Sequence, residues 1–347
     1  MSKKYIKNLK KKYIFALIVI IIGGSISVFT VFYYRSCAYK DDWAFYNYGQ
    51  TINNSQGIKG IDINIRSINN SDCSKNKVTV AVADTGIDYN CEILQDRILF
   101  NDNDPLNGCD DDENGYNDDF YGWNFYDFNN SIFEDSLYDY HGTYIATTIA
   151  KVNPNVKILP VKFLKSTIGS SEDAVSALEY AISRGAKIIN CSWNFNERDE
   201  ELLTLIKEHP DILFICAAGN SNINIDAEPL YPCSYVFDNM INVMAIDNTG
   251  KPYKASGYGK RTIDIAAPGV DVKVVIPGNE ETLINGTSVA AAYVTGASSL
   301  LLSKNGSLTP KEIKSILISC ATKTNELESF CVAGGFLNIA ESLKFAN

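Results

Sequence analysis

Hydrophobic residues along this chain fall into short apolar runs that alternate with longer amphipathic segments. The runs of β-branched and aliphatic residues predict strands buried on both faces, and they occupy residues 78–83, 156–164, 186–191 and 212–217. The intervening segments predict helices, one running from the capping sequence Ser170-Ser171-Glu172-Asp173 to about Ser183 before Gly185, and one over residues 196–208. This alternation predicts an α/β fold, with a parallel sheet covered by helices on both faces.

Two further apolar helices are each preceded by small and polar residues. One follows His141-Gly142-Thr143 and continues to Ala150, and the other follows Asn285-Gly286 and continues to Leu302. Ser288 falls in the first turn of the second helix, among unpaired backbone N–H groups at the positive end of the helix dipole. Because such groups stabilise an oxyanion, Ser288 is a candidate nucleophile; an N-cap serine on a core helix would give the same local pattern.

A serine nucleophile needs a base, and histidine is the usual one. The chain has two histidines. His209 precedes a proline at the end of a polar helix, which is typical of a surface turn. His141 instead opens an apolar helix, and Asp84 ends the apolar strand 78–83, where a carboxylate can orient an imidazole ring. We therefore predict that Asp84, His141 and Ser288 act together.

Three short motifs now indicate a family. They stand in the order Asp84-Thr85-Gly86, His141-Gly142-Thr143 and Gly286-Thr287-Ser288, and they resemble the three signatures of the subtilisin-like serine proteases. The resemblance extends from about Trp43 to the C-terminus. It implies the subtilisin-like three-layer fold, with a mostly parallel central sheet covered by helices on both faces. It also implies a serine endopeptidase in which Ser288 attacks, His141 transfers the proton and Asp84 holds the His141 tautomer.

The same resemblance implies roles for residues around the substrate. Asn220, in Ala217-Ala218-Gly219-Asn220, corresponds to the side chain that stabilises the oxyanion together with the Ser288 N–H. Substrate-binding positions follow from two family segments, and they are Ser192, Trp193, Asn194, Ala217 and Gly219. Relatives usually carry glycine where Asn194 stands, so we expect a narrower cleft. Tyr231-Pro232 corresponds to a segment that often contains a cis proline.

Several positions near the motifs depart from the family pattern. They are Tyr144, Thr147, Val289, Ala292 and Tyr293, and none of them removes a group that transfers a proton or donates to the oxyanion. We expect catalysis with altered selectivity. The alternative is a catalytically weak relative that binds peptides, but such a protein has no chemical need to keep Asp84, His141, Asn220 and Ser288 together.

The N-terminal region predicts a membrane anchor. Residues 1–12 carry six lysines and no acidic residue, and residues 13–34 are 22 residues without a charge, long enough to cross a bilayer. We expect the N-terminus in the cytoplasm, a single-pass signal anchor at 13–34, a linker and lead-in at 35–76, and an extracellular catalytic domain at 77–347. The alternative is secretion after signal cleavage near Ser36-Cys37-Ala38. In the resembled family a comparable lead-in already belongs to the catalytic domain, so we expect no inhibitory propeptide here.

The charge beyond the predicted anchor is strongly acidic. Residues 36–347 hold 24 of the 31 basic side chains and all 41 acidic ones, a net charge of −17. Such a surface repels phosphate backbones, which argues against nucleic acid as a partner. The expected partners are a peptide or protein substrate and, through the N-terminal helix, the membrane.

Acidic residues concentrate between residues 102 and 119. The sequence Asp110-Asp111-Asp112-Glu113-Asn114-Gly115 fits the opening of a calcium loop, with Asp110, Asp112 and Asn114 as ligands. The acidic residue that would close an EF-hand loop is replaced by Tyr121. A structural Ca²⁺ and a solvated acidic loop are both consistent with this pattern, and the predicted hydrolysis itself requires no cofactor.

The chain has nine cysteines, so at least one thiol is unpaired within it. Cys191 and Cys216 lie in apolar strands and are predicted to be buried thiols. The spacing of the remaining cysteines does not define a disulfide pattern, and it resembles no zinc site.

Overall fold

The computed structural model of the chain describes residues 42–68 and 76–346. The predicted anchor at 13–34 and the basic segment 1–12 lie outside these ranges. Within the described ranges, no helix has both the length and the apolar character needed to cross a bilayer. The described ranges comprise residues 42–68 and 76 of the predicted lead-in and residues 77–346 of the predicted catalytic domain.

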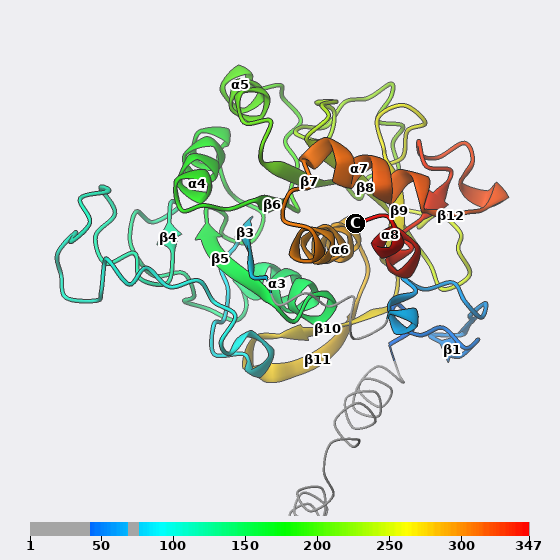
Figure 1. Cartoon of the computed structure of the whole chain (residues 1–347), viewed down its shortest axis with the longest axis horizontal. Helices are drawn as coiled ribbons and strands as arrows, with labels where there is room; N and C mark the ends of the chain where they lie inside the picture. The colour runs from blue at the N-terminus through cyan, green and yellow to red at the C-terminus, as the bar shows by residue number, and fades with distance from the viewer. Residues whose placement is uncertain (1–41, 69–75, 347) are drawn as a thin grey trace, which may run out of the picture. The chain divides into compact units, whose positions relative to one another are not determined.

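A nine-stranded sheet forms the centre of this domain (Figure 1). Its strand order is β12-β13-β9-β8-β7-β6-β3-β5-β4, and every neighbouring pair is parallel except β12 with β13. The strands are β3 (Val78–Asp84), β4 (Trp123–Asn124), β5 (Val156–Lys162), β6 (Ile188–Cys191), β7 (Leu213–Ala217), β8 (Met240–Ile246), β9 (Ile265–Pro268), β12 (Thr322–Lys323) and β13 (Gly335–Phe336). This mostly parallel sheet confirms the predicted fold class.

Two antiparallel hairpins, six helices and several single-turn 3-10 helices surround the sheet in the described residues. The hairpins are β1 (Thr51–Ile52) with β2 (Ser55–Gln56) and β10 (Val272–Ile276) with β11 (Glu280–Ile284). The α-helices are α3 (Tyr140–Val152), α4 (Ser171–Ser183), α5 (Glu200–Glu208), α6 (Thr287–Lys304), α7 (Pro310–Ser319) and α8 (Ile339–Lys344). The 3-10 helices are η1 (Ile65–Ser67), η3 (Glu92–Leu94), η4 (Pro277–Asn279) and η5 (Asn325–Leu327).

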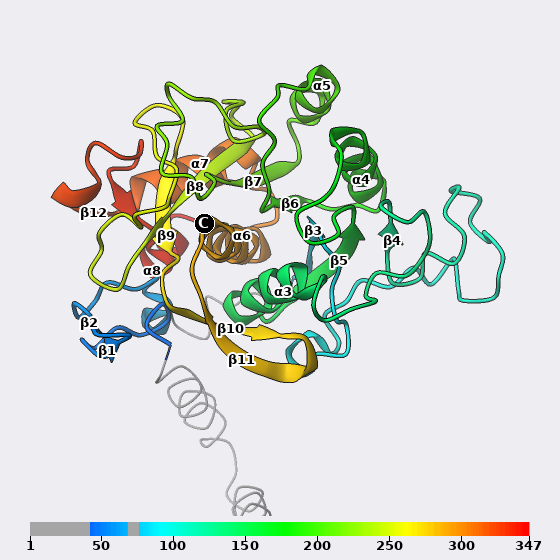
Figure 2. The same ribbon diagram turned by 180° about the vertical axis from the view of Figure 1, so that it is seen from behind.

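Strand order determines which face each helix covers. The chain passes from β3 through α3 to β5 in one direction along the sheet, and from β5 through α4 to β6 in the other. Because such crossovers are right-handed, α3 lies on one face and α4 on the opposite face. Helix α6 packs against α3 on the first face, and α5 lies beside α4 on the second (Figures 1 and 2). This arrangement gives the three layers that the sequence predicts.

The boundaries of several predicted elements need correction; the strands expected from residues 186 and 212 begin at Ile188 and Leu213. The helix expected from residue 196 begins at Glu200, because the Asp199 side chain caps it by accepting hydrogen bonds from the backbone N–H groups of Glu201 and Leu202. The strand expected to reach residue 164 ends at Lys162, where β5 stops pairing with β3. By contrast, α4 has the predicted bounds, and the Ser170 hydroxyl caps it.

The reversal of crossover direction creates a crevice at the carboxyl ends of the strands β3 and β6. From β3 the chain moves to β5, whereas from β6 it moves to β7, so the loops after the neighbouring strands β3 and β6 diverge. Open α/β sheets bind ligands at such a position, outside the carboxyl ends of the strands. Asp84 ends β3 and Ser192 follows β6 directly, so both lie at this crevice.

Candidate active site

Asp84 and His141 are in direct contact at the end of β3. The Asp84 Oδ1 atom lies 2.7 Å from His141 Nδ1, and the Asp84 side chain is fully buried while that of His141 is 24% exposed. The Thr85 N–H donates to the same Asp84 oxygen at 2.7 Å. The carboxylate is therefore fixed, and the exposed side of the imidazole is free to exchange a proton.

Gly142, which follows His141, lets the start of α3 approach Gly86 in the turn after Asp84. A side chain on Gly142 would place its Cβ only 2.3 Å from the Gly86 carbonyl oxygen, so the start of α3 could not approach the end of β3 as closely. The Gly142 N–H donates to the Thr85 hydroxyl at 3.1 Å, which aligns the two segments. The motifs Asp84-Thr85-Gly86 and His141-Gly142-Thr143 are thus two halves of one packing unit.

Ser288 is the second residue of α6 and lies against the segment that follows β6. Its hydroxyl donates to the Ser192 carbonyl oxygen at 3.3 Å, and the Ser192 hydroxyl donates back to the Ser288 carbonyl at 3.2 Å. Ser288 and His141 line the same cavity, which has a volume of about 410 Å³. The Ser288 hydroxyl must turn from Ser192 before His141 can accept its proton.

Asn220 faces the same cavity from the loop after β7. Its Oδ1 atom accepts from the Thr287 N–H at 2.9 Å, so the orientation of the side-chain amide is fixed from the first residue of α6. With Oδ1 engaged in this way, the Nδ2 group remains as the donor. A donor held beside the backbone N–H of Ser288 is the arrangement that stabilises a developing oxyanion.

The remaining predicted substrate residues line this cavity as well. Ser192, Trp193 and Asn194 form one wall, and Ala217 and Gly219 form the other. Trp193 is only 7% exposed, because its indole N–H donates to the Ala83 carbonyl oxygen at 3.0 Å and anchors this wall to β3. The Tyr231-Pro232 peptide bond is cis, as the resemblance implies. Every substrate-binding residue predicted from the sequence thus reaches one cavity.

Two of the departures from the family pattern, Tyr144 and Thr147, lie on α3, and Tyr144 contacts His141. The Tyr144 ring packs edge-on against the imidazole with 4.9 Å between ring centroids. Burial raises the pKa of Tyr144 well above its usual value, so the phenol stays neutral beside Asp84. The Thr147 hydroxyl donates to the Val275 carbonyl oxygen at 2.9 Å and ties α3 to the β10–β11 hairpin. Tyr144 thus packs against the base and Thr147 holds the helix that carries it, while the His141–Asp84 contact is intact.

A buried ion pair near the site escaped the sequence analysis. Lys162 Nζ lies 2.5 Å from Asp139 Oδ1, both side chains are 1% exposed, and the same ammonium donates to the Thr85 carbonyl oxygen. Asp139 stands directly before α3, two residues before His141. The sequence signal for this pair is Lys162 inside the apolar run 156–164, because a buried charge requires a partner of opposite charge.

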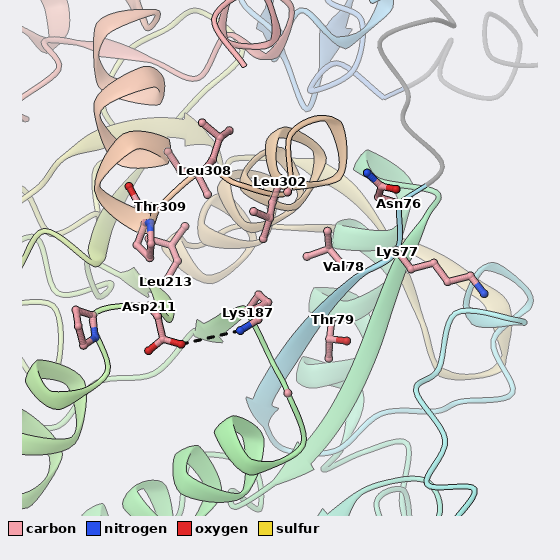
Figure 3. Close-up of a pocket in the computed structure, with 15 residues that line it drawn as sticks. Asn76, Lys77, Val78, Thr79, Lys187, Asp211, Leu213, Leu302, Leu308 and Thr309 are labelled. Carbon is pink, nitrogen blue, oxygen red and sulfur yellow. Dashed lines mark ion pairs between the residues drawn. The ribbon is translucent and has the colours of Figure 1, made fainter. Parts of the chain in front are cut away.

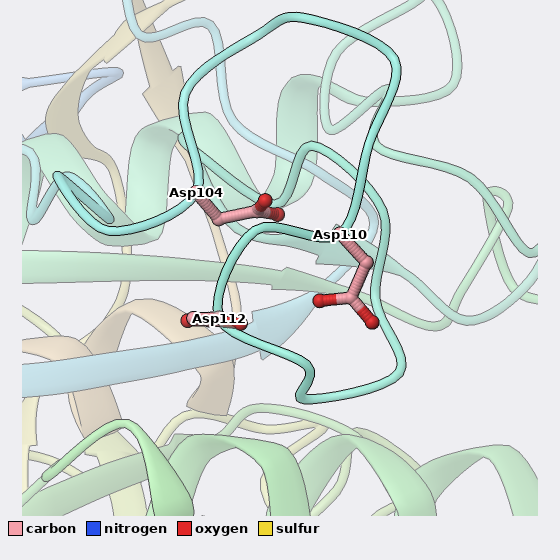
Figure 4. A group of neighbouring side chains, drawn as sticks. All are labelled: Asp104, Asp110 and Asp112. Atoms are coloured by element: carbon pink, nitrogen blue, oxygen red, sulfur yellow. The ribbon is translucent and has the colours of Figure 1, made fainter.

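The acidic loop brings three carboxylates together (Figure 4). One ligand atom from each of Asp104, Asp110 and Asp112 lies within 4.8 Å of the others. The Asn114 oxygen, predicted as a ligand, instead accepts from the Tyr116 N–H at 2.8 Å. Three carboxylates at this spacing suit a hard, oxygen-preferring cation such as Ca²⁺. The gathered set contains Asp110 and Asp112, as predicted, and has Asp104 where the sequence predicts Asn114.

A second cavity lies at the opposite end of the strands (Figure 3). It has a volume of about 710 Å³, and it is lined by the first residues of β3, by Leu213 of β7 and by residues of α6 and α7. Its charged residues include Lys187 and Asp211, whose side chains are 4.0 Å apart. Neither His141 nor Ser288 lines it. The larger cavity is thus separate from the candidate active site.

The described cysteines are all free thiols, namely Cys91, Cys109, Cys191, Cys216, Cys233, Cys320 and Cys331. Cys191 and Cys216 are fully buried on neighbouring strands, as predicted. Burial raises the pKa of Cys233 to about 12, so this thiol is neutral at the edge of the cavity wall.

Comparisons with known proteins agree with this fold. Residues 75–334 match the subtilase family (Peptidase_S8). The chain is 30% identical over 302 residues to subtilisin-like protease 1 of Plasmodium falciparum, and the match covers 77% of this chain and 43% of that protein. It is 32% identical over 212 residues to subtilisin DY of Bacillus licheniformis, covering 57% of this chain and 76% of that one. The chain thus spans less than half the length of the Plasmodium relative.

Solved structures show the same architecture. A cold-adapted subtilisin-like serine proteinase superimposes with a TM-score of 0.60 at 24% identity, covering 75% of this chain and 89% of that one. The prenylagaramide maturation protease PagA superimposes with a TM-score of 0.62 at 25% identity, covering 80% and 96%. The fold is the subtilisin-like α/β fold. The chain belongs to the subtilase family.

Proposed function

We propose that this chain hydrolyses peptide bonds with a triad of Asp84, His141 and Ser288, through an acyl-enzyme intermediate. The observation that carries the proposal is the 2.7 Å contact between His141 Nδ1 and Asp84 Oδ1, made beside a cavity that His141 and Ser288 share. A histidine oriented by a buried carboxylate and facing a serine is the arrangement that activates a hydroxyl nucleophile.

In the first half of the reaction, Ser288 Oγ attacks the carbonyl carbon of the substrate and His141 Nε2 takes the hydroxyl proton. Asp84 holds the Nδ1–H tautomer and stabilises the imidazolium that forms. The negative charge on the former carbonyl oxygen is met by the Asn220 Nδ2 group and the Ser288 N–H. His141 then returns the proton to the leaving amine, the C–N bond breaks and the acyl-enzyme remains.

In the second half, water takes the place of the departed amine. His141 removes a proton from the water while its oxygen attacks the acyl carbon, and the same two donors stabilise the second oxyanion. Collapse of this intermediate breaks the bond to Ser288 Oγ, which recovers its proton from His141. The products are a new carboxylate and the original enzyme, so no redox or metal step is needed.

The location of this activity is part of the proposal. The lysine-rich residues 1–12 followed by the uncharged residues 13–34 support a signal anchor with the catalytic domain outside the cytoplasm. We infer selective processing of exported peptides or proteins, with PagA, a maturation protease at 25% identity, as a structural parallel. Release of the domain after signal cleavage is the alternative.

We also propose that Ca²⁺ occupies the acidic loop. The converging carboxylates of Asp104, Asp110 and Asp112 support it, since three like charges within 4.8 Å repel one another without a cation. Such an ion would stabilise the loop by offsetting the repulsion among these carboxylates. Its role would be structural, because no step of the proposed hydrolysis involves it.

The competing function is peptide binding without turnover. The experiment that separates the two is labelling of the full chain, in detergent, with a fluorophosphonate probe, which reacts with an activated serine. We expect labelling of the wild type and none of Ser288→Ala or His141→Ala. Absence of labelling in folded wild-type protein would favour the peptide-binding alternative.

A further inference from the structure

Two side chains from different segments, those of Leu230 and Asn194, line the substrate cavity beside Gly219. Gly219 has a left-handed backbone, with φ of +84°, and the space where its Cβ would stand is already taken. That point is 2.8 Å from Leu230 Cδ1 and 3.2 Å from Asn194 Oδ1. A large substrate side chain entering between the walls at 192–194 and 217–219 therefore meets Leu230 and Asn194.

Asn194 is held rigidly in this position. Its Nδ2 group donates to the Ala217 carbonyl oxygen at 3.0 Å and to Cys233 Sγ at 3.6 Å. The opposite orientation of the amide would place Oδ1 against the Ala217 carbonyl oxygen, so this contact fixes which atom points where. In the described part of the chain no donor reaches Asn194 Oδ1, and this oxygen is the atom that faces Gly219 and the cavity.

The segment that carries Leu230 is equally fixed. Phe195 and Tyr231 exchange two backbone hydrogen bonds, at 2.6 and 2.9 Å, which lock the two segments one residue away from Asn194 and Leu230. The Leu230 N–H also donates to the Ser234 hydroxyl at 3.0 Å, and the neutral Cys233 thiol donates to the Leu230 carbonyl oxygen at 3.2 Å. Neither side chain can easily withdraw to admit a larger group.

We infer that this cavity selects a substrate whose P1 residue, the one that supplies the attacked carbonyl, is short and carries a hydrogen-bond donor: serine, threonine or asparagine. Leu230 and Asn194 limit its length, and Asn194 Oδ1 supplies an acceptor for its donor. A buried acceptor left unpaired by an apolar residue costs affinity, which separates side chains of equal size. This inference rests on the proposed function and deepens it by naming the substrate class.

The test uses isosteric pairs of P1 residues and does not depend on catalysis. Fluorescent peptides ending in threonine or valine, and in asparagine or leucine, are titrated against full-length Ser288→Ala protein by fluorescence anisotropy. We expect threonine to bind about tenfold more tightly than valine, and asparagine about tenfold more tightly than leucine. Peptides ending in phenylalanine or lysine should bind weakest. Equal affinities within both pairs, or a preference for phenylalanine, would overturn the inference.

Three second-site variants of the Ser288→Ala protein assign the effect. Asn194→Leu keeps the size but removes the acceptor, so the preference for threonine over valine should disappear. Leu230→Ala deepens the cavity, so leucine and phenylalanine should gain affinity while the preference for threonine persists. Asn194→Gly introduces the residue that relatives usually carry. It should admit large side chains and abolish the preference for threonine over valine. This variant tests the role of Asn194 if Asn194→Leu does not fold.

Fluorophosphonate labelling of Ser288 in wild-type protein, purified in parallel with Ser288→Ala, distinguishes failure of the P1 inference from failure of the proposed protease function. Labelling with a flat ranking of peptides contradicts the P1 inference and leaves the proposed protease function standing. A clear ranking without labelling contradicts the protease function and leaves only the side-chain preference of the cavity standing, as a property of peptide binding.

Discussion

The ammonium group of Lys162 is sandwiched between the carboxylate of Asp139 and the carbonyl oxygen of Thr85, with the lysine and aspartate side chains each 1% exposed. One contact reaches the residue before α3, which carries His141, and the other reaches the residue after Asp84. A charged pair that contributes no atom to the proposed chemistry thus fixes the two elements that hold the base and its orienting carboxylate.

Removing one partner of this pair should strongly destabilise the domain. Lys162→Met leaves Asp139 charged and buried without a counter-ion, so we expect a loss of roughly 3–5 kcal/mol in the free energy of unfolding. Urea denaturation of the purified variant measures it. The double variant Lys162→Met/Asp139→Asn removes both charges and should recover part of the loss. A single variant within about 1 kcal/mol of the wild type would contradict this account of the pair.

Loss of the Asn220 donor should slow the chemical step and leave substrate binding nearly unchanged. We expect Asn220→Ala to lower kcat by roughly 10²–10³-fold with little change in KM, a magnitude known for the corresponding asparagine of subtilisin and not calculated for this chain. Steady-state hydrolysis of a quenched peptide measures both constants. Asn196→Ala is the control, since Asn196 lines the same cavity without a proposed catalytic role. An equal effect of the two substitutions would remove the case for an oxyanion donor.

Calcium should raise the melting temperature of the protein. An ion that binds only the folded state stabilises it by about 2.7 kcal/mol when present at 100 times its Kd, so millimolar Ca²⁺ should raise Tm by several degrees relative to EDTA. The double variant Asp110→Asn/Asp112→Asn should lose this response. Asp211→Asn, which alters a carboxylate that is 68% exposed elsewhere, should keep it. Identical melting curves with Ca²⁺ and EDTA would argue for a solvated loop.

Asp42 should make the protein less stable as the pH rises from 4 to 7. Burial raises the pKa of Asp42 from 3.8 to about 6, against the opposing effect of Lys151. Over the window between these values the folded state binds more protons than the unfolded state, so the free energy of unfolding falls with rising pH, by roughly 3 kcal/mol in total. Asp42→Asn keeps an acceptor for the Ala44 N–H and cannot ionise.

The measurement is urea denaturation of the wild type and Asp42→Asn at pH 4, 5, 6 and 7. The stability difference between the two proteins should change in favour of the variant over this range. A difference that is constant with pH would show that Asp42 does not titrate in the folded protein with a raised pKa.

The sequence predicted those parts of the fold that depend on local pattern. The strand before Asp84 is an uninterrupted apolar run and has the predicted start, and the capping sequence at Ser170 placed α4 correctly. The start of α5 was misplaced because polar residues 196–199 fit a helical face as well as a loop, and only the Asp199 cap separates the two. The position of Asp84 at a strand end, the position of His141 at a helix start and the family resemblance predicted these two residues as partners, and the structure places them in contact.

Local sequence patterns could not predict the contacts between segments that are distant in sequence. Asp104 joins Asp110 and Asp112 because the chain folds back on itself, whereas a linear loop motif points to Asn114. Lys162 and Asp139 belong to a strand and to the loop before a helix, and neither segment identifies the other. Leu230 was missed for the same reason, since only the three-dimensional structure brings it to the space beside Gly219.

Every residue of helix α6 from Thr287 to Ser303 is buried, and at its first turn Thr287 and Ser288 line the substrate cavity. Beyond that turn the helix cannot open by itself, because exposing it requires the sheet and its neighbouring helices to separate. Amide hydrogen exchange in α6 beyond its first turn should therefore occur only through complete unfolding of the domain. The helix that carries the proposed nucleophile then has no partly unfolded state of its own, and the reactivity of Ser288 reports the population of the native protein as a whole.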